Sequence, residues 1–290
     1  MKKLISLVAV MSLALTVFAQ PVTKNFAVAN YTGISAGSVF DIELTKSSVE
    51  SLKIEAENDV MPYIQAKVNS GVLYLKLDNS MPSKLSRNMD PIKVKISIKE
   101  LDKLFLSGAA KLKSNGTFSP ASFKADISGA VLAEGLFVNT GLSEITVSGA
   151  SKFDLTGKAT TANYEFSGAS TANIAQDIQD LSISASGAVR MEYTGKTAKS
   201  DISISGAANA RFIGSSVTAI VEVSGASQLE ADKFLVADMD LEVSGVGNVK
   251  VNVSKSISAE VSGGSSVRYI GNPVVKNLET NTGSSFKKMN

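Results

Sequence analysis

The chain has 290 residues, of which 44% are hydrophobic and 22 are Gly, and it contains neither Cys nor His. The absence of those two residue types excludes thiol nucleophiles, thiolate metal sites and catalysis by a histidine base. Without Lys2 and Lys3, 29 − 2 = 27 basic residues face 27 acidic ones, so nothing in the charge favours nucleic acid or an anionic membrane as a partner.

Residues 1–19 have the features of a secretory signal peptide. Lys2 and Lys3 precede the apolar segment Leu4–Val17, and Val17-Phe18-Ala19 fits a cleavage site, so we expect the mature chain to begin at Gln20. No Cys is present to carry a lipid anchor, and no later segment is long enough to predict an integral membrane helix. The protein is therefore expected to be exported, to the periplasm, the cell surface or the medium.

Residues 21–100 are predicted to form irregular β-strands. Alternating apolar residues mark strands at Phe40–Leu44, Leu52–Ala56, Leu73–Leu77 and Ile92–Ile98, and Asn69-Ser70-Gly71 is typical of a hairpin turn. We interpret this block as irregular first rungs, or a cap, of a repeat protein, because an uncovered end would expose a sheet edge.

Two surface features of this block are candidate contact sites. Lys93, Lys95 and Lys99 lie on the outward face of one predicted strand, and they either meet acidic glycans or, as we favour, protect a sheet edge from aggregation. The segment Asp78–Pro91 interrupts two strong strands, which makes it either a contact loop or a disordered connection. The candidate contact residues in this loop are Asp78, Met81, Lys84, Arg87, Met89 and Asp90.

Residues 101–271 contain nine regular repeats. A Ser-Gly pair recurs every 18 to 21 residues, and Ala follows it in seven of the nine. The Gly residues are Gly108, Gly129, Gly149, Gly168, Gly187, Gly206, Gly225, Gly245 and Gly263. The residue two before each Gly is always apolar, and so is the residue four after it.

This alternation on both sides of a Gly turn predicts two half-buried strands per repeat. One repeat cannot bury its apolar face alone, so the repeats must stack. At about 4.8 Å per rung, nine rungs form a rod on the order of 40 Å long. The fold class is thus predicted to be all-β, a single-stranded β-helix with nine or more Ser-Gly-Ala rungs. We expect right-handed winding because the strict six-residue pattern of left-handed helices is missing.

The tail, residues 272–290, breaks the pattern and is predicted to be a C-terminal cap or a frayed tail. Thr282-Gly283 forms a degenerate tenth turn. No linker divides residues 20–290, so we expect a single domain.

At the repeated Ser-Gly-Ala turns the chain resembles the head GIN domain family of auto-transporter adhesins. The strands from Phe26 to the first turn at Ser107-Gly108 are similar to the usual layout of that family as well. The resemblance implies a pectin-lyase-like β-helix in an exported bacterial protein with an adhesive role.

Three alternatives for chemistry follow from the repeats. A polysaccharide lyase would need clustered Asp residues around Ca²⁺, and no dense cluster appears, so no catalytic residue, cofactor or metal site is predicted. The Ser residues before Gly form a hydroxyl ladder that either binds a ligand or, as we favour, suits the turn. Glu222, Glu242 and Glu260 form a possible acidic ladder, which is either a solvated surface, as we favour, or a weak Ca²⁺ site.

The function predicted from the sequence is that of a non-enzymatic cell-envelope or surface protein, an adhesin or scaffold. The alternative is a carbohydrate-binding or carbohydrate-active β-helix protein. Partners are expected to be an extracellular protein or a glycan, and flat sheet faces also allow self-association. Stacking on a sugar is not supported, since only Tyr31, Tyr63 and Tyr74 remain for exposed rings.

Overall fold

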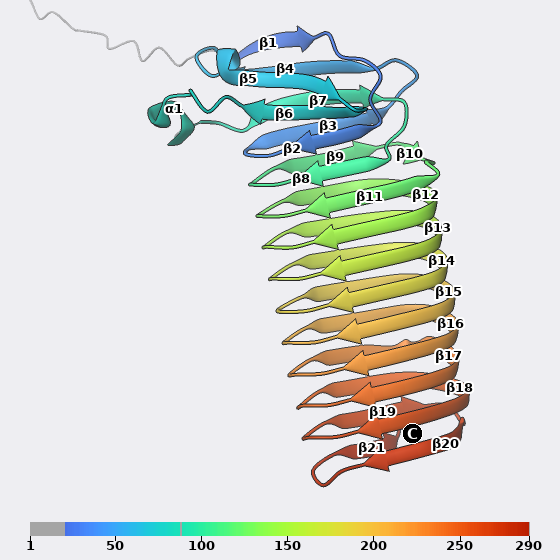
Figure 1. Ribbon diagram of the computed structural model, residues 1–290. Coiled ribbons are helices and arrows are strands. Elements are labelled where there is room, and N and C mark those ends of the chain that lie inside the picture. Colours follow the sequence, from blue (N-terminus) through green and yellow to red (C-terminus); the bar gives the residue numbers. More distant parts are fainter. Residues whose placement is uncertain (1–20, 88, 290) are drawn as a thin grey trace, which may run out of the picture.

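The protein is a β-solenoid of about ten stacked coils, seen in a computed structural model that describes residues 21–87 and 89–289. Figure 1 shows the coils stacked into a straight rod, with additional strands at the N-terminal end. The predicted β-helix is confirmed. The predicted signal peptide, residues 1–19, lies outside the described residues.

The N-terminal end contains most of the short elements. The strands here are β1 (Pro21–Phe26), β2 (Gly33–Ala36), β3 (Phe40–Lys46), β4 (Ser51–Glu57), β5 (Ile64–Asn69), β6 (Val72–Leu77), β7 (Ile92–Ile98), β8 (Lys103–Leu106), β9 (Lys111–Asn115), β10 (Thr117–Phe118) and β11 (Ser122–Ile127). Two short helical segments interrupt them, the 3-10 turn η1 (Met61–Tyr63) and the helix α1 (Ser83–Arg87).

The regular coils follow, each a long strand that bends around one edge of the rod. They are β12 (Leu132–Val147), β13 (Lys152–Phe166), β14 (Thr171–Ala185), β15 (Arg190–Ile204), β16 (Asn209–Val223), β17 (Gln228–Val243) and β18 (Asn248–Val261), followed by the shorter β19 (Ser266–Ile270), β20 (Val274–Thr280) and β21 (Ser285–Lys288). Each coil pairs in parallel with the next. One face of the rod therefore holds the strand before each Gly turn, and the other face holds the strand after it.

The Gly residues are required at the turns for two physical reasons. All nine have a positive φ, between 69° and 90°, which residues with a Cβ rarely adopt. In addition, the turns stack so closely that a Cβ on Gly206 would lie closer than 3.0 Å to the backbone of Gly187. Backbone hydrogen bonds such as Ala207 N–H to Gly187 C=O, 2.9 Å long, join successive turns.

The core is a continuous column of inward side chains, as the period-two pattern predicts. Tyr193, Phe212 and Phe234 form an aromatic cluster with ring centroids 5.6 to 6.2 Å apart, and all three are buried. Several buried polar groups find partners inside this column, while the hydroxyls of Ser114 and Ser170 have none among the described residues. The Tyr164 hydroxyl donates to the Gln176 side chain, and the Tyr193 hydroxyl donates to the Gln176 carbonyl at 2.8 Å.

The N-terminal block closes its end of the core. β4 runs antiparallel to β7 and β1 runs antiparallel to β4, while the β5–β6 hairpin turns through Ser70 and Gly71, both with positive φ. The predicted hairpin turn and the four predicted strands are confirmed. Tyr31, one of the three tyrosines that the sequence left as candidates for exposed rings, is only 1% exposed, and its hydroxyl donates to the backbone carbonyls of Ser51 and Ser97.

Beyond the last Ser-Gly pair the chain forms a further, incomplete coil. β20 pairs with β18, and β21 pairs with β19, both in parallel. The turn between them is closed by Ser284 N–H donating to the Asn281 carbonyl at 3.0 Å. The predicted tenth turn at Thr282-Gly283 is confirmed.

Candidate functional site

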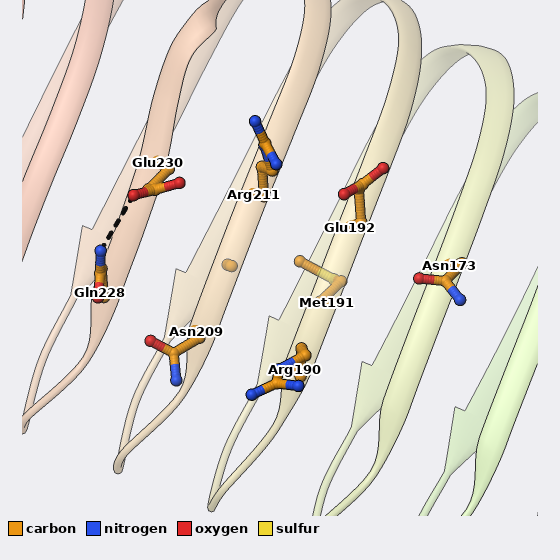
Figure 2. Close-up of a pocket in the computed structure, with 9 residues that line it drawn as sticks. Asn173, Arg190, Met191, Glu192, Asn209, Arg211, Gln228 and Glu230 are labelled. Carbon is orange, nitrogen blue, oxygen red and sulfur yellow. Dashed lines mark hydrogen bonds between the residues drawn. The ribbon is translucent and has the colours of Figure 1, made fainter.

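A shallow polar groove of about 300 Å³ crosses four coils, β14 to β17, on the face that follows the Gly turns. Figure 2 shows its side chains in two rows. One row runs along the register Arg190, Asn209 and Gln228, and the other along Glu192, Arg211 and Glu230. Met191 and Ala210, at the positions between the two rows, also line the groove.

The polar groups of this groove are held by a rigid backbone, while several of them remain available to a ligand. Within residues 21–87 and 89–289, neither Arg190 nor Arg211 forms an ion pair. Glu230 accepts a hydrogen bond from Gln228 at 3.1 Å and lies 3.6 Å from the Lys250 ammonium. The groove therefore offers two guanidinium groups, which bind carboxylates or sulfates well, beside amide donors and acceptors and the two carboxylates of Glu192 and Glu230.

The acidic ladder lies on the opposite face. The register places Glu222 beside Glu242 and Glu242 beside Glu260, and all three are exposed. The ladder continues to Glu279, which the sequence analysis missed because Asn281-Thr282-Gly283 replaces the usual Ser-Gly-Ala there. Glu222, Glu242 and Glu260 line a shallow depression in this face, and Asp240 lines it as well. None of the four ladder residues has an ion-pair partner in the described part of the chain.

The segment Asp78–Pro91, the candidate contact loop, is held in part by hydrogen bonds and packing of its own residues. Asp78 accepts hydrogen bonds from the backbone N–H and the hydroxyl of Ser80, at 2.8 and 2.7 Å. Both bonds lower the pKa of the Asp78 carboxyl, and the backbone bond has the larger effect. Met81 and Met89 pack against the core. Lys84 and Arg87 are exposed on α1, and Asp90 is exposed beyond it. The loop thus presents two cations on a short helix whose ends are held by methionines.

Lys93 and Lys95 on β7, and Lys99 just after it, do not protect a sheet edge, so our interpretation of these lysines was wrong. β7 lies between β3 and β4. Its lysines pair with acids on neighbouring elements, since Lys93 lies 2.9 Å from Glu55 and Lys95 lies 3.1 Å from Glu43. The hydrogen bond between Lys93 and Glu55 raises the pKa of the lysine and lowers that of the carboxyl.

A second set of serines, two residues after the turn Gly, was not singled out from the sequence. Ser151, Ser227 and Ser265 are buried, and each hydroxyl donates to the carbonyl of the turn Gly one coil earlier, at 3.1 to 3.3 Å. These bonds join the coils at their narrow edge. The signal in the sequence is the recurrent Ser at this position, Ser-Gly-Ala-Ser in its commonest form.

The buried tyrosines are the most strongly perturbed titratable groups. Burial raises the pKa of Tyr31 from 10.0 to about 12, and it raises the pKa values of Tyr164 and Tyr193 further. All three lie inside the core, so the shifts reflect packing. The described residues hold no cluster of three or more acids placed to bind a metal ion, and none of their helices has the length and hydropathy to cross a membrane.

Comparison with solved structures shows the fold. A crystal structure of a putative adhesin from Parabacteroides merdae is 16% identical, with a TM-score of 0.52, and the match covers 93% of this chain and 97% of that one. A putative adhesin from Parabacteroides distasonis is 18% identical, with a TM-score of 0.50 and coverage of 93% and 98%. No curated protein matches the sequence.

The family comparison agrees with the resemblance noted at the Ser-Gly-Ala turns. Residues 30–178 and 169–273 match the family described as "Putative auto-transporter adhesin, head GIN domain". Together these two matches span nearly the whole described solenoid. The chain belongs to the head GIN domain family.

Proposed function

We propose that the chain is a non-enzymatic, exported protein of the cell envelope or cell surface that uses its rigid solenoid as an adhesin or scaffold. The observation that carries this proposal is the polar groove on β14 to β17. Its side chains project from a ladder of parallel strands, so their spacing is fixed before a partner arrives. Such pre-organisation lowers the entropic cost of binding.

The family description supports the adhesive role, and the N-terminal sequence supports export. The groove also supports a more specific candidate, a carbohydrate-binding solenoid. Arg190 and Arg211 lack ion-pair partners among the described residues, and Asn209 and Gln228 offer both donors and acceptors between them. This set suits an acidic polysaccharide, whose carboxylates or sulfates would meet the guanidinium groups. Its hydroxyls would meet the amides and the carboxylates of Glu192 and Glu230, which flank Arg211.

A binding experiment separates these candidates. The purified protein is applied to immobilised acidic polysaccharides, neutral polysaccharides and extracellular matrix proteins. The carbohydrate candidate predicts binding to an acidic polysaccharide that falls at least about tenfold in the double variant R190A/R211A, since each charged hydrogen bond contributes roughly 1.5–3 kcal/mol. Arg268→Ala, an exposed arginine on the same face but outside the groove, is the matched control.

Each result has a distinct meaning for the proposed function. Binding to a matrix protein and to no polysaccharide supports the adhesin and contradicts the carbohydrate candidate. A loss per removed charge as large in R268A as in R190A/R211A would mean that binding follows net charge, and the groove would not be the site.

A further inference from the structure

Two aromatic side chains, Tyr74 on β6 and Phe105 on β8, point outward near the N-terminal end of the solenoid. They lie on the face that holds the strand before each Gly turn. Each lies between two buried leucines and is itself only half-buried. Phe105 occupies the position three residues before Gly108, which is polar in the other eight repeats. Neither ring belongs to the hydrophobic core, so packing of the core does not account for them.

The strand register places the two rings in one column. Ser35 on β2 pairs with Tyr74 on one side and with Phe105 on the other, and Figure 1 shows β6, β2 and β8 following one another along the rod. At about 4.8 Å per strand, the rings are roughly 10 Å apart, with only the small Ser35 side chain between them. This spacing is comparable to that of alternate sugar rings along an extended glycan. The sequence alone did not support sugar stacking, because this register could not be derived from it.

A depression of about 240 Å³ adjoins Tyr74 on the outer face of the β5–β6 hairpin, and Gln65, Lys67, Asn69 and Lys76 line it together with the ring. Lys67 pairs with Tyr74 across the hairpin, and the Lys76 ammonium lies 5.3 Å from the centroid of the Tyr74 ring. An exposed cation–π contact of this kind is weak. A sugar ring can therefore displace the ammonium from the face of Tyr74 and pair an anionic substituent with it.

The charges beside Tyr74 favour an anionic ligand. Lys67 and Lys76 are exposed, and neither forms an ion pair within residues 21–87 and 89–289. Asp78 adjoins them, but Ser80 and Gln65 already donate hydrogen bonds to its carboxylate oxygens. The two ammonium groups are thus available to a carboxylate or a sulfate.

The charges beside Phe105 balance instead. Lys103 and Lys124 lie next to each other in the register, and they are accompanied by Asp102 and Asp126. This end of the column therefore suits an uncharged sugar, whose apolar C–H face packs on the ring.

We propose that the column Lys67, Tyr74, Ser35 and Phe105, with Lys76 beside it, binds a short segment of an acidic glycan. A uronate or sulfated sugar stacks on Tyr74 and pairs with Lys67 and Lys76, and a second sugar of the same chain stacks on Phe105. Asn69 and the Gln65 side chain bind hydroxyls of the first sugar. The site lies on the face opposite the groove on β14 to β17 and does not depend on it.

A single-stranded nucleic acid also stacks on aromatic side chains, but it fits this face less well. Its phosphates would continue along the column past Phe105, where Asp126 and, two coils further, Glu165 follow. A polyanion with a charge on every unit is repelled there, whereas a short glycan segment ends at Phe105.

The test is isothermal titration calorimetry of the purified protein with four probes. These are oligogalacturonate for the carboxylate, chondroitin sulfate oligosaccharides for the sulfate, neutral cello-oligosaccharides, and a single-stranded oligonucleotide. The expected result is that an acidic oligosaccharide binds more tightly than the other two classes and that added salt weakens its binding. Tyr74→Ala and Phe105→Ala each raise the Kd at least about tenfold, as truncation of an aromatic anchor does. Lys67→Ala raises it severalfold and reduces its dependence on salt.

Matched variants separate the site from general effects. Tyr74→Phe and Phe105→Tyr keep the rings and the binding, which controls for a loss of structure in the alanine variants, and circular dichroism confirms that each variant is folded. Phe137→Ala, at a ring 41% exposed on β12, and Lys113→Ala, at an exposed lysine on the opposite face, leave the Kd unchanged. R190A/R211A also leaves it unchanged, so failure of this site and failure of the groove are distinguishable.

Several results would overturn the proposal. They are no binding of either acidic oligosaccharide, tighter binding of the neutral oligosaccharide or of the oligonucleotide, and parental affinity in both Tyr74→Ala and Phe105→Ala. Loss of binding in R190A/R211A with parental affinity in Tyr74→Ala would assign the glycan to the groove instead.

Discussion

The turn between β18 and β19 contains two adjacent glycines that predict opposite outcomes on substitution by alanine. Gly263 has φ = 71°, and a Cβ there would overlap the carbonyl oxygen of Gly245. Gly264 has no positive φ, and a Cβ there would lie 3.3 Å from the Val246 side chain. Seven other turns carry Ala at the position of Gly264.

The magnitude follows from these geometries. For Gly263→Ala, the left-handed backbone costs roughly 1–2 kcal/mol. The Cβ also displaces the Gly245 carbonyl, which accepts the Gly264 N–H at 2.7 Å, and weakening that bond costs about 0.5–1.5 kcal/mol. We expect a loss of about 2–3 kcal/mol in the free energy of unfolding. Gly264→Ala should change it between zero and a gain of about 1 kcal/mol, because Ala restricts the unfolded chain.

Urea denaturation followed by far-UV circular dichroism measures both variants against the parent protein. Gly206→Ala repeats the test in the middle of the rod, where fraying of an end does not contribute. The cost of the left-handed backbone and the cost of the displaced carbonyl both apply there as well. If Gly263→Ala and Gly264→Ala differ by less than about 0.5 kcal/mol, a typical effect of a neutral surface change, the stacked-turn explanation is incorrect.

Three further predictions concern the core and the acidic ladder. Phe212→Ala, in the buried aromatic cluster, should cost about 3–5 kcal/mol in urea denaturation, and a loss below about 1 kcal/mol would contradict the packing described. Glu242→Lys removes the repulsion from the like charges of Glu222 and Glu260 and should raise the free energy of unfolding by about 0.5–1 kcal/mol at low ionic strength. Added salt should reduce this gain, and no gain at low salt would show that solvent fully screens the ladder. Burial raises the pKa values of Tyr31, Tyr164 and Tyr193, so the native state keeps their protons, and the stability that they contribute is complete below pH 10. That stability is lost as the pH rises through about 12 for Tyr31 and at still higher pH for the other two. In a spectrophotometric titration these three tyrosines should ionise only together with the loss of circular dichroism, and ionisation while the protein remains folded would contradict their burial.

The regular coils could be predicted from the sequence because two periodicities coincide there. The period of two identifies which residues point inward, and the Ser-Gly marker sets where each coil turns. Phe153, Met191 and Leu229 all occupy the inward position that the pattern predicts. Register between coils then follows from the spacing of the markers, so the acidic pairs Glu222–Glu242 and Glu242–Glu260 were predicted correctly.

The N-terminal block was harder to predict because alternation does not specify the direction of a strand or its neighbours. Nothing local in Ser51–Glu57 indicates that β4 runs antiparallel between β1 and β7. For the same reason the lysines of β7 were assigned to an edge. Glu55, the partner of Lys93, is 38 residues away from it along the chain, and only the fold brings the two together.

The polar groove was not predicted because its residue types change from coil to coil. Arg190, Asn209 and Gln228 share one position in the repeat but no common chemistry. Their grouping depends on the register between coils, which places one member of each row on each of three successive coils. The sequence showed that the segment Asp78–Pro91 interrupts two strands, but its anchoring by Met81 and Met89 required the structure.

The proposed surface role is tested most directly by protease treatment of intact cells that express the protein at its natural level. If the chain is an adhesin on the cell surface, the added protease releases fragments of it while a periplasmic marker and a cytoplasmic marker remain intact. Fragments that include the β14–β17 coils would show that the groove faces the medium. A chain that stays intact on whole cells, and is recovered from the periplasmic or cytoplasmic fraction after lysis, would contradict the adhesin.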